Sequence, residues 1–193
     1  MTQRLVIGLC GPEGAGKSTV AKLLTNKFEG ELVPFASPLK RMLSALGVSD
    51  RHLYGTPDEK EEPLGILGGK SARQAMQLLG TEWGRDAICA DLWVRAWHVA
   101  VSKKAGWLIV ADDLRFQNEA DAIKALGGVV VCVLKKPAAL ATSDLTNLHR
   151  SQEFFKIPRD HIIVNDGSLE DLDSMVWRLM QHLHAEPQVQ KIA

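Results

Sequence analysis

The chain has 193 residues, of which 46% are hydrophobic and 24% charged, with 23 basic and 23 acidic side chains. This composition is ordinary for a globular protein, and the length suits one domain better than two. A formal charge of zero provides no broad basic face, which disfavours a polymeric nucleic acid as partner. The three cysteines are far apart, and no apolar run approaches the ~20 residues of a membrane span. We therefore expect a cytoplasmic protein that does not associate with membranes.

The first motif along the chain is a glycine-rich loop. The run Gly11-Pro12-Glu13-Gly14-Ala15-Gly16-Lys17-Ser18 matches G-x-x-x-x-G-K-[ST] in full. A buried strand is predicted before it, over residues 4–10, and a helix after it, over residues 19–28. The glycines let several backbone N–H groups point at one place, and the helix N-terminus adds a partial positive charge. This context predicts a nucleoside triphosphate site.

We expect the loop to bind ATP. Lys17 would reach the β- and γ-phosphates, and the Ser18 hydroxyl would bind Mg²⁺. The residues expected to bind ATP in this loop are Gly11, Gly14, Ala15, Gly16, Lys17, Ser18 and Thr19.

The next segments surround a predicted irregular region. A short strand is predicted over residues 31–36, and a helix follows with Ser37 as N-cap and Pro38 at its first position. Residues 47–70 hold five glycines and a cluster of charges, which predicts a long irregular segment. Ser71 and Gln74 have the spacing of a capping box that opens another helix. Asp91 is predicted to cap the helix after that.

Apolar strands and helices alternate through the second half of the chain. Strands are predicted over 107–111, 129–134 and 161–164, and helices over 117–126 and from Ser168 onward. Strands that are apolar throughout and alternate with helices predict an α/β fold with a parallel sheet covered on both faces. Ligands gather at the carboxyl ends of such strands.

Asp112 and Asp113 follow the strand 107–111 directly, at this ligand-binding edge. A carboxylate in that position holds Mg²⁺ or its water shell in phosphate-loop proteins. The sequence does not decide which of the two does so, and a solvated turn is the alternative. Arg115 lies just beyond and is expected either to contact phosphate oxygens or to pair with Glu119, four residues on.

Further cationic residues follow the long loop. Arg73 and Gln77 are spaced i, i+4 and share a helix face, and Arg85 lies just beyond them. Together they predict a site for an acceptor phosphate, with ordinary helix solvation as the alternative. Trp93 is expected in the acceptor region or in the core. The basic segment 135–160, which includes Arg150, is predicted to act as a lid over ATP.

Taken together, these residues resemble the bacteriophage-type deoxynucleoside monophosphate kinases, relatives of the adenylate-kinase group. The motifs that carry the resemblance are the glycine-rich loop, Phe35-Ala36-Ser37-Pro38-Leu39-Lys40, Arg73-Gln74, Leu79-Gly80-Thr81-Glu82-Trp83-Gly84-Arg85, Asp112-Asp113-Leu114-Arg115-Phe116-Gln117-Asn118-Glu119 and Val164-Asn165-Asp166-Gly167-Ser168-Leu169. They span residues 5 to about 180.

The resemblance implies a P-loop, three-layer α/β/α fold with a five-stranded parallel sheet. It implies ATP- and Mg²⁺-dependent phosphorylation of a deoxynucleoside 5′-monophosphate to the diphosphate, which supplies DNA precursors. One kinase domain would cover residues 1–186, with an acceptor region at about 37–104, the lid at about 135–160 and a flexible tail at 187–193. A homodimer is a further expectation.

The resemblance also implies roles for particular residues. Lys17, Arg115, Asp112 and Asp113 would be catalytic, and Arg150 and Asn165 would join the ATP site. The expected acceptor-binding residues are Ser37, Lys40, Arg41, Arg73, Gln77, Arg85 and Trp93. The alternatives are a P-loop kinase for a hydroxymethylated base in DNA, phosphomevalonate or dephospho-coenzyme A, and a non-catalytic nucleotide-binding regulator.

Overall fold

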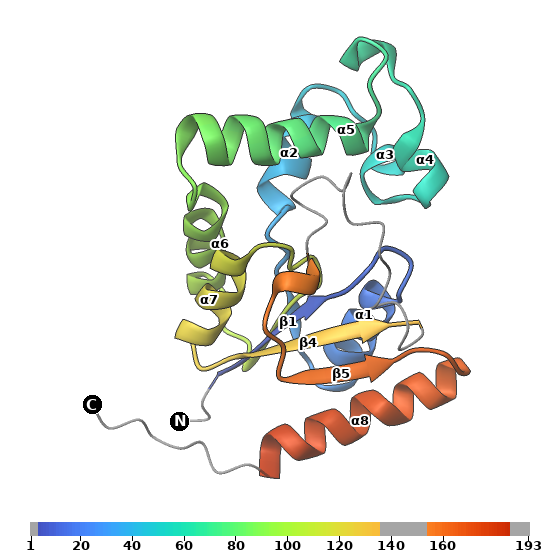
Figure 1. Cartoon of the computed structure of the whole chain (residues 1–193), viewed down its shortest axis with the longest axis vertical. Helices are drawn as coiled ribbons and strands as arrows, with labels where there is room; N and C mark the ends of the chain where they lie inside the picture. The colour runs from blue at the N-terminus through green and yellow to red at the C-terminus, as the bar shows by residue number, and fades with distance from the viewer. Residues whose placement is uncertain (1–3, 136–153, 186–193) are drawn as a thin grey trace.

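The computed structural model describes residues 4–135 and 154–185 of the chain. Strands and helices alternate along most of the described sequence (Figure 1). Their bounds are β1 Leu5–Cys10, α1 Lys17–Lys27, β2 Glu31–Leu32, α2 Ser37–Ala45, α3 Asp50–Tyr54, α4 Pro57–Glu61, a 3₁₀ turn Gly65–Leu67, α5 Ala72–Gln77, a π-helix Leu78–Ile88, α6 Leu92–Ser102, β3 Leu108–Ala111, α7 Gln117–Ala125, β4 Val129–Leu134, a 3₁₀ turn Phe154–Lys156, β5 His161–Val164 and α8 Leu169–Ala185.

The strands form one parallel sheet in the order β2-β3-β1-β4-β5. The central strand β1 pairs with β3 on one side and with β4 on the other. The strands that follow β1 in the sequence are therefore added to the sheet on both sides of it. Ligands bind at such a switch point, outside the carboxyl ends of the strands. The predicted α/β class and five-stranded parallel sheet are confirmed.

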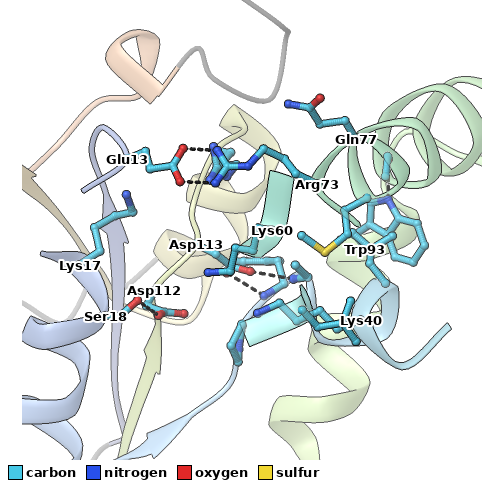
Figure 2. Close-up of a pocket in the computed structure, with 18 of the residues that line it drawn as sticks. Glu13, Lys17, Ser18, Lys40, Lys60, Arg73, Gln77, Trp93, Asp112 and Asp113 are labelled. Atoms are coloured by element: carbon cyan, nitrogen blue, oxygen red, sulfur yellow. Dashed lines mark hydrogen bonds and ion pairs between the residues drawn. The ribbon is translucent and has the colours of Figure 1, made fainter. Parts of the chain in front are cut away.

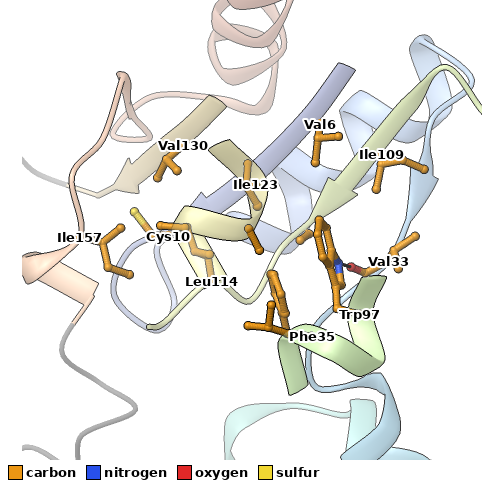
Figure 3. Packing of buried hydrophobic residues seen from close by; sticks show 14 of the residues in the cluster. Val6, Cys10, Val33, Phe35, Trp97, Ile109, Leu114, Ile123, Val130 and Ile157 are labelled. Atoms are coloured by element: carbon orange, nitrogen blue, oxygen red, sulfur yellow. Dashed lines mark hydrogen bonds between the residues drawn. The ribbon is translucent and has the colours of Figure 1, made fainter. Parts of the chain in front are cut away.

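Helices cover both faces of the sheet because alternate strand residues point to opposite sides. On one face, Val6 and Cys10 of β1 belong to a buried cluster with residues of α6 and α7 (Figure 3). On the other face, Leu5, Ile7 and Leu9 pack with α1 and α8. The sheet is therefore the middle layer of three. The buried clusters on its two faces hold the strands in place, and with them the strand ends that carry the site.

The helices α2 to α5 lie beyond the carboxyl ends of the strands (Figure 1) and have a small core of their own. Its buried members are Leu43, Val48, Leu53 and Ala72. The prediction of an irregular segment over residues 47–70 is wrong, because α3 and α4 form there. A capping box between Thr56 and Glu59 begins α4, and burial of Leu53 anchors α3.

The N-caps of α2, α5 and α6 can be compared with the predicted helix starts. The capping box of Ser71 and Gln74 is confirmed at the start of α5. Ser37 is not an N-cap: Ala36 occupies that position, and Ser37 is the first residue of α2. The backbone N–H of Ala36 is instead bound by Asp113, so a distant carboxylate fixes the chain at the start of this helix. Asp91 stands at the N-cap of α6, but its carboxylate accepts from Asn118 rather than from the helix.

No helix in the described ranges combines the length and apolarity that crossing a membrane requires. The predicted tail 187–193 and most of the predicted lid, with Arg150, lie outside the described residues.

Candidate active site

The glycine-rich loop connects β1 to α1 and requires glycine at several positions. Gly11, Gly14 and Gly16 all have positive φ, at 136°, 71° and 98°. A Cβ atom on Gly11 would lie 2.1 Å from the carbonyl oxygen of Val133, and one on Gly16 would lie 2.3 Å from Nδ2 of Asn165. Neighbouring backbone and side chain therefore leave no space for larger residues at these two positions.

Lys17 spans the loop from its C-terminal end. Its Nζ donates to the carbonyl oxygens of Gly11, at 2.8 Å, and Pro12, at 2.7 Å. Burial lowers the pKa of Lys17 to about 8, and the positive charge of Arg115 contributes in the same direction. The ammonium is therefore held inside the loop by neutral carbonyls, which phosphate oxygens can replace.

Asn165, which the resemblance assigns to the ATP site, lies beside the loop. Its Nδ2 donates to the carbonyl oxygen of Ala15 at 2.9 Å, and its backbone N–H donates to Leu134 at 2.6 Å. This residue follows β5 directly, so the carboxyl ends of β4 and β5 support the loop from the side.

Ser18 and Asp112 form the donor set that suits Mg²⁺. The Ser18 hydroxyl donates to Oδ2 of Asp112 at 3.0 Å, which joins the start of α1 to the end of β3 (Figure 2). Hydroxyl and carboxylate oxygens are ligands that Mg²⁺ prefers. Within the described part of the chain, no group of three His, Cys, Asp or Glu side chains is placed to hold a metal. The pair fits an ion that completes its shell with water and substrate phosphates.

Asp113 has different partners from Asp112. Its two carboxylate oxygens accept from the backbone N–H groups of Phe35, at 2.9 Å, and Ala36, at 2.8 Å. Burial raises the pKa of Asp113, and the neighbouring charge of Asp112 adds to the effect. This carboxylate fixes the backbone that leads into α2.

A cavity of about 450 Å³ joins the loop to the helices α2, α4 and α5. Lys17, Ser18 and Asp112 line one part of it, and residues predicted for the acceptor line another (Figure 2). These acceptor-side residues are Lys40, Arg73, Gln77, Arg85 and Trp93. Ser37 and Arg41 are not among the described residues that line the cavity.

Arg73 projects from the first turn of α5 toward the loop. Both of its terminal nitrogens bind the carboxylate of Glu13, a loop residue (Figure 2). The Nε of Arg73 lies 2.9 Å from Oε1 of Glu61. Sequence reasoning missed Glu13 and Glu61. Both are charged residues, but their partner Arg73 lies more than ten positions away in the sequence, and only the packing of α4 and α5 places it beside them.

Arg85 is held differently, in a buried ion pair with Glu119. Their side chains are only 5% and 4% exposed, and Nη2 of Arg85 lies 2.5 Å from Oε1 of Glu119. Arg85 also donates to the Ala90 carbonyl at 3.0 Å, and its guanidinium stacks on the ring of Phe116. The alternative interpretation of Arg85 as a solvated helix residue is wrong, since tertiary contacts bury this arginine against the cavity wall.

Glu119 supports the segment after β3 as well. Its Oε2 accepts from the backbone N–H groups of Arg115, at 2.8 Å, and Phe116, at 3.1 Å. Burial raises the pKa of Glu119 to about 7, while Arg85 opposes that rise. The side chain of Arg115 lines the cavity, close enough to Lys17 to lower the pKa of that lysine.

Trp93 both lines the cavity and packs in the protein interior. Its Nε1 donates to the carbonyl oxygen of Gly80 at 2.7 Å, and its ring leaves no space for a Cβ atom on Gly84. The wide π-helix over Leu78–Ile88 carries these two glycines toward the indole. π-Helical turns are rare and are frequently found at functional sites.

Comparisons with known proteins by sequence show the family of the chain. A family model described as deoxynucleotide monophosphate kinase matches residues 58–176. A protein of Acanthamoeba polyphaga mimivirus, provisionally named a deoxynucleotide monophosphate kinase, is 32% identical over 186 residues, covering 89% of this chain and 94% of that protein.

Solved structures resemble the fold at low sequence identity. The crystal structure of TT1252 from Thermus thermophilus has a TM-score of 0.51 and 18% identity, covering 94% of this chain and 98% of that one. Shikimate kinase from Bacteroides thetaiotaomicron has a TM-score of 0.52 and 16% identity, covering 93% and 98%. These two structures support the fold alone. The family match and the viral relative place the chain by sequence, and it belongs to the deoxynucleotide monophosphate kinase family.

Proposed function

We propose that the cavity described above transfers the γ-phosphoryl group of ATP to the 5′-phosphate of a deoxynucleoside monophosphate, with Mg²⁺. Family membership makes the chain a kinase that uses ATP. The observation that carries the residue-level proposal is that the phosphate loop and the cationic residues of α2 and α5 line the same cavity. Donor and acceptor can therefore meet in one cavity.

On the donor side, the loop amides and Lys17 bind the β- and γ-phosphates of ATP. Lys17 exchanges its two carbonyl partners for phosphate oxygens, which neutralises charge where it develops. Ser18 and Asp112 would hold Mg²⁺, which would neutralise part of the negative charge of the phosphates. Asn165 keeps the loop in its binding conformation.

On the acceptor side, Arg73 binds the monophosphate through its planar fork. Lys40 and Gln77 line the same region, together with apolar side chains of Phe35, Leu39 and Met76. Such a wall suits a base and a sugar, while the arginine suits a dianionic phosphate. Asp113 and the Arg85–Glu119 pair act as positioning residues, because they fix the backbone and the walls around the acceptor.

The chemistry is an in-line displacement that depends on placement and charge neutralisation. An acceptor phosphate oxygen is already ionised at neutral pH, so no side chain has to remove a proton. Arg115 lines the same cavity and contributes positive charge next to Lys17. The intact Lys17, Ser18 and Asp112 favour an enzyme over a non-catalytic regulator, and the predicted homodimer stays a prediction.

The variant Arg73→Ala tests the acceptor assignment. A charge-assisted contact contributes about 1.5–3 kcal/mol, so kcat/KM for the monophosphate should fall on the order of 10- to 150-fold. The KM for ATP should stay within about twofold of the wild-type value. Arg73→Lys should rescue poorly, because an ammonium cannot form the two-pronged contact. Steady-state kinetics with the monophosphate varied at saturating ATP measures this.

Arg95→Ala is the matched control, since Arg95 is an exposed arginine of α6 that does not line the cavity. It should leave both KM values unchanged. An Arg73→Ala enzyme that matches wild type, or one in which only the KM for ATP rises, would contradict the assignment.

A further inference from the structure

The two terminal nitrogens of Arg73 are occupied by a residue of the phosphate loop. Nη1 and Nη2 each bind one carboxylate oxygen of Glu13, in the bidentate geometry that Arg also forms with phosphate (Figure 2). A phosphate that forms a bidentate contact with this edge of the guanidinium uses the same two N–H groups as the Glu13 carboxylate, so this edge cannot hold both at once. An acceptor phosphate that binds this edge must replace Glu13.

The two partners differ in how firmly they are held. The Arg73 side chain is 21% exposed, and its Nε lies 2.9 Å from Glu61, at an angle that forms no hydrogen bond. The Glu13 side chain is 46% exposed and precedes Gly14, around which there is open space. Glu13 is therefore the partner that can turn away while Arg73 stays in place beside Glu61.

Charge favours this contact in the ligand-free protein. The hydrogen bonds from Arg73 lower the pKa of Glu13, so the carboxylate is ionised at neutral pH. Lys60 and Arg115 also lie close enough to lower this pKa, and both line the cavity. A displaced Glu13 carboxylate thus remains near positive charge.

We propose that Glu13 is a place-holder for the acceptor phosphate: it orients the Arg73 fork in the empty site and is displaced when the monophosphate binds. The proposal rests on the assignment of Arg73 to the acceptor under Proposed function. Glu13 keeps the arginine in its binding geometry, at a cost to acceptor affinity, and so sets the concentration at which the monophosphate binds.

The variant Glu13→Gln tests the proposal, because it removes the charge that competes with the phosphate. Partly exposed ion pairs contribute little, so we expect monophosphate affinity to rise about two- to fivefold. Glu13→Ala should act in the same direction. The measurement is isothermal titration calorimetry without ATP, using dAMP, dCMP, dGMP and dTMP and following the tightest binder.

Two further proteins make the result specific. In an Arg73→Ala background, Glu13→Gln should have no effect on monophosphate affinity, because the guanidinium for which Glu13 and the phosphate compete is absent. Glu62→Gln is the matched control: Glu62 is a 40% exposed carboxylate paired with Arg51, and it does not line the cavity. Its affinity should equal that of the wild type.

The outcomes separate the two proposals. If Arg73→Ala weakens binding but Glu13→Gln leaves it unchanged or weaker, the place-holder role is overturned and the acceptor assignment stands. If Arg73→Ala binds as wild type does, both are overturned. An equal gain in Glu62→Gln would show a general charge effect and would also overturn the role of Glu13.

Discussion

Asp112 and Asp113 are neighbours in the sequence, but their carboxylates bind on different sides of the strand end. The sequence was enough to place the pair at the ligand-binding edge, because a buried apolar strand runs directly into it. It could not assign their roles. These depend on where Ser18 and the backbone of Phe35 and Ala36 lie, and those contacts join residues 77 to 94 positions apart.

The two carboxylates should respond differently to Asn substitution. Asp112→Asn should raise the Mg²⁺ concentration for half-maximal activity by about tenfold or more and lower kcat, since it loses the charge beside Ser18. Asp113→Asn should leave the Mg²⁺ titration unchanged and lower the free energy of unfolding by about 1–3 kcal/mol, because the partly buried N–H groups of Phe35 and Ala36 lose a carboxylate acceptor. Mg²⁺ titrations and urea unfolding of both variants check this, and identical Mg²⁺ curves would contradict it.

Lys17 should take up a proton when ATP binds in alkaline solution. Its pKa is lowered to about 8 in the ligand-free protein, and phosphate anions favour the ammonium and raise this pKa in the complex. At pH 9 the free enzyme is mostly unprotonated at Lys17, so binding should take up about one proton, and at pH 7 almost none. Calorimetry in buffers of different ionisation enthalpy measures the uptake. The same uptake in Lys17→Met would contradict this origin.

At the scale of elements, the stretch from α5 through the π-helix gives Arg73 and Arg85 different surroundings that the sequence could not distinguish. The sequence placed Arg73 and Arg85 on or beside one helix, and both line the cavity. A regular α-helical spacing does not describe Leu78–Ile88, where the wider turns carry Arg85 into contact with α7. Its partner Glu119 lies on α7, 34 positions further along the chain, and helical periodicity does not predict contacts between separate helices.

Arg85→Ala should therefore be a stability mutation first. Removing Arg85 leaves Glu119 buried without its cationic partner, which costs about 3–5 kcal/mol of unfolding free energy. Arg73→Ala should change stability by less than about 1 kcal/mol, because its carboxylate partners are about half exposed. Urea unfolding of the two variants gives the comparison. Equal losses in both would show that the two ion pairs do not differ as described.

At the scale of the whole molecule, the strands β1, β3 and β4 could be located from the sequence because each is apolar throughout. β4 and β5 were predicted with their observed bounds. The short helices α3 and α4 were missed because glycines and charges surround them, and they depend on a capping box and on one buried leucine. Glu13, which has a charged partner 60 residues away, carries no local signal of its role.

The central claim is that the acceptor of the phosphoryl group is a nucleotide phosphate. The most direct test incubates the protein with ATP, Mg²⁺ and each deoxynucleoside 5′-monophosphate, with the matching deoxynucleosides in parallel, and separates the products by ion-exchange chromatography. We expect ADP and a deoxynucleoside diphosphate in equal amounts from at least one monophosphate, and no phosphorylated product from the deoxynucleosides. Absence of every diphosphate, or phosphorylation of a deoxynucleoside hydroxyl, would contradict the account.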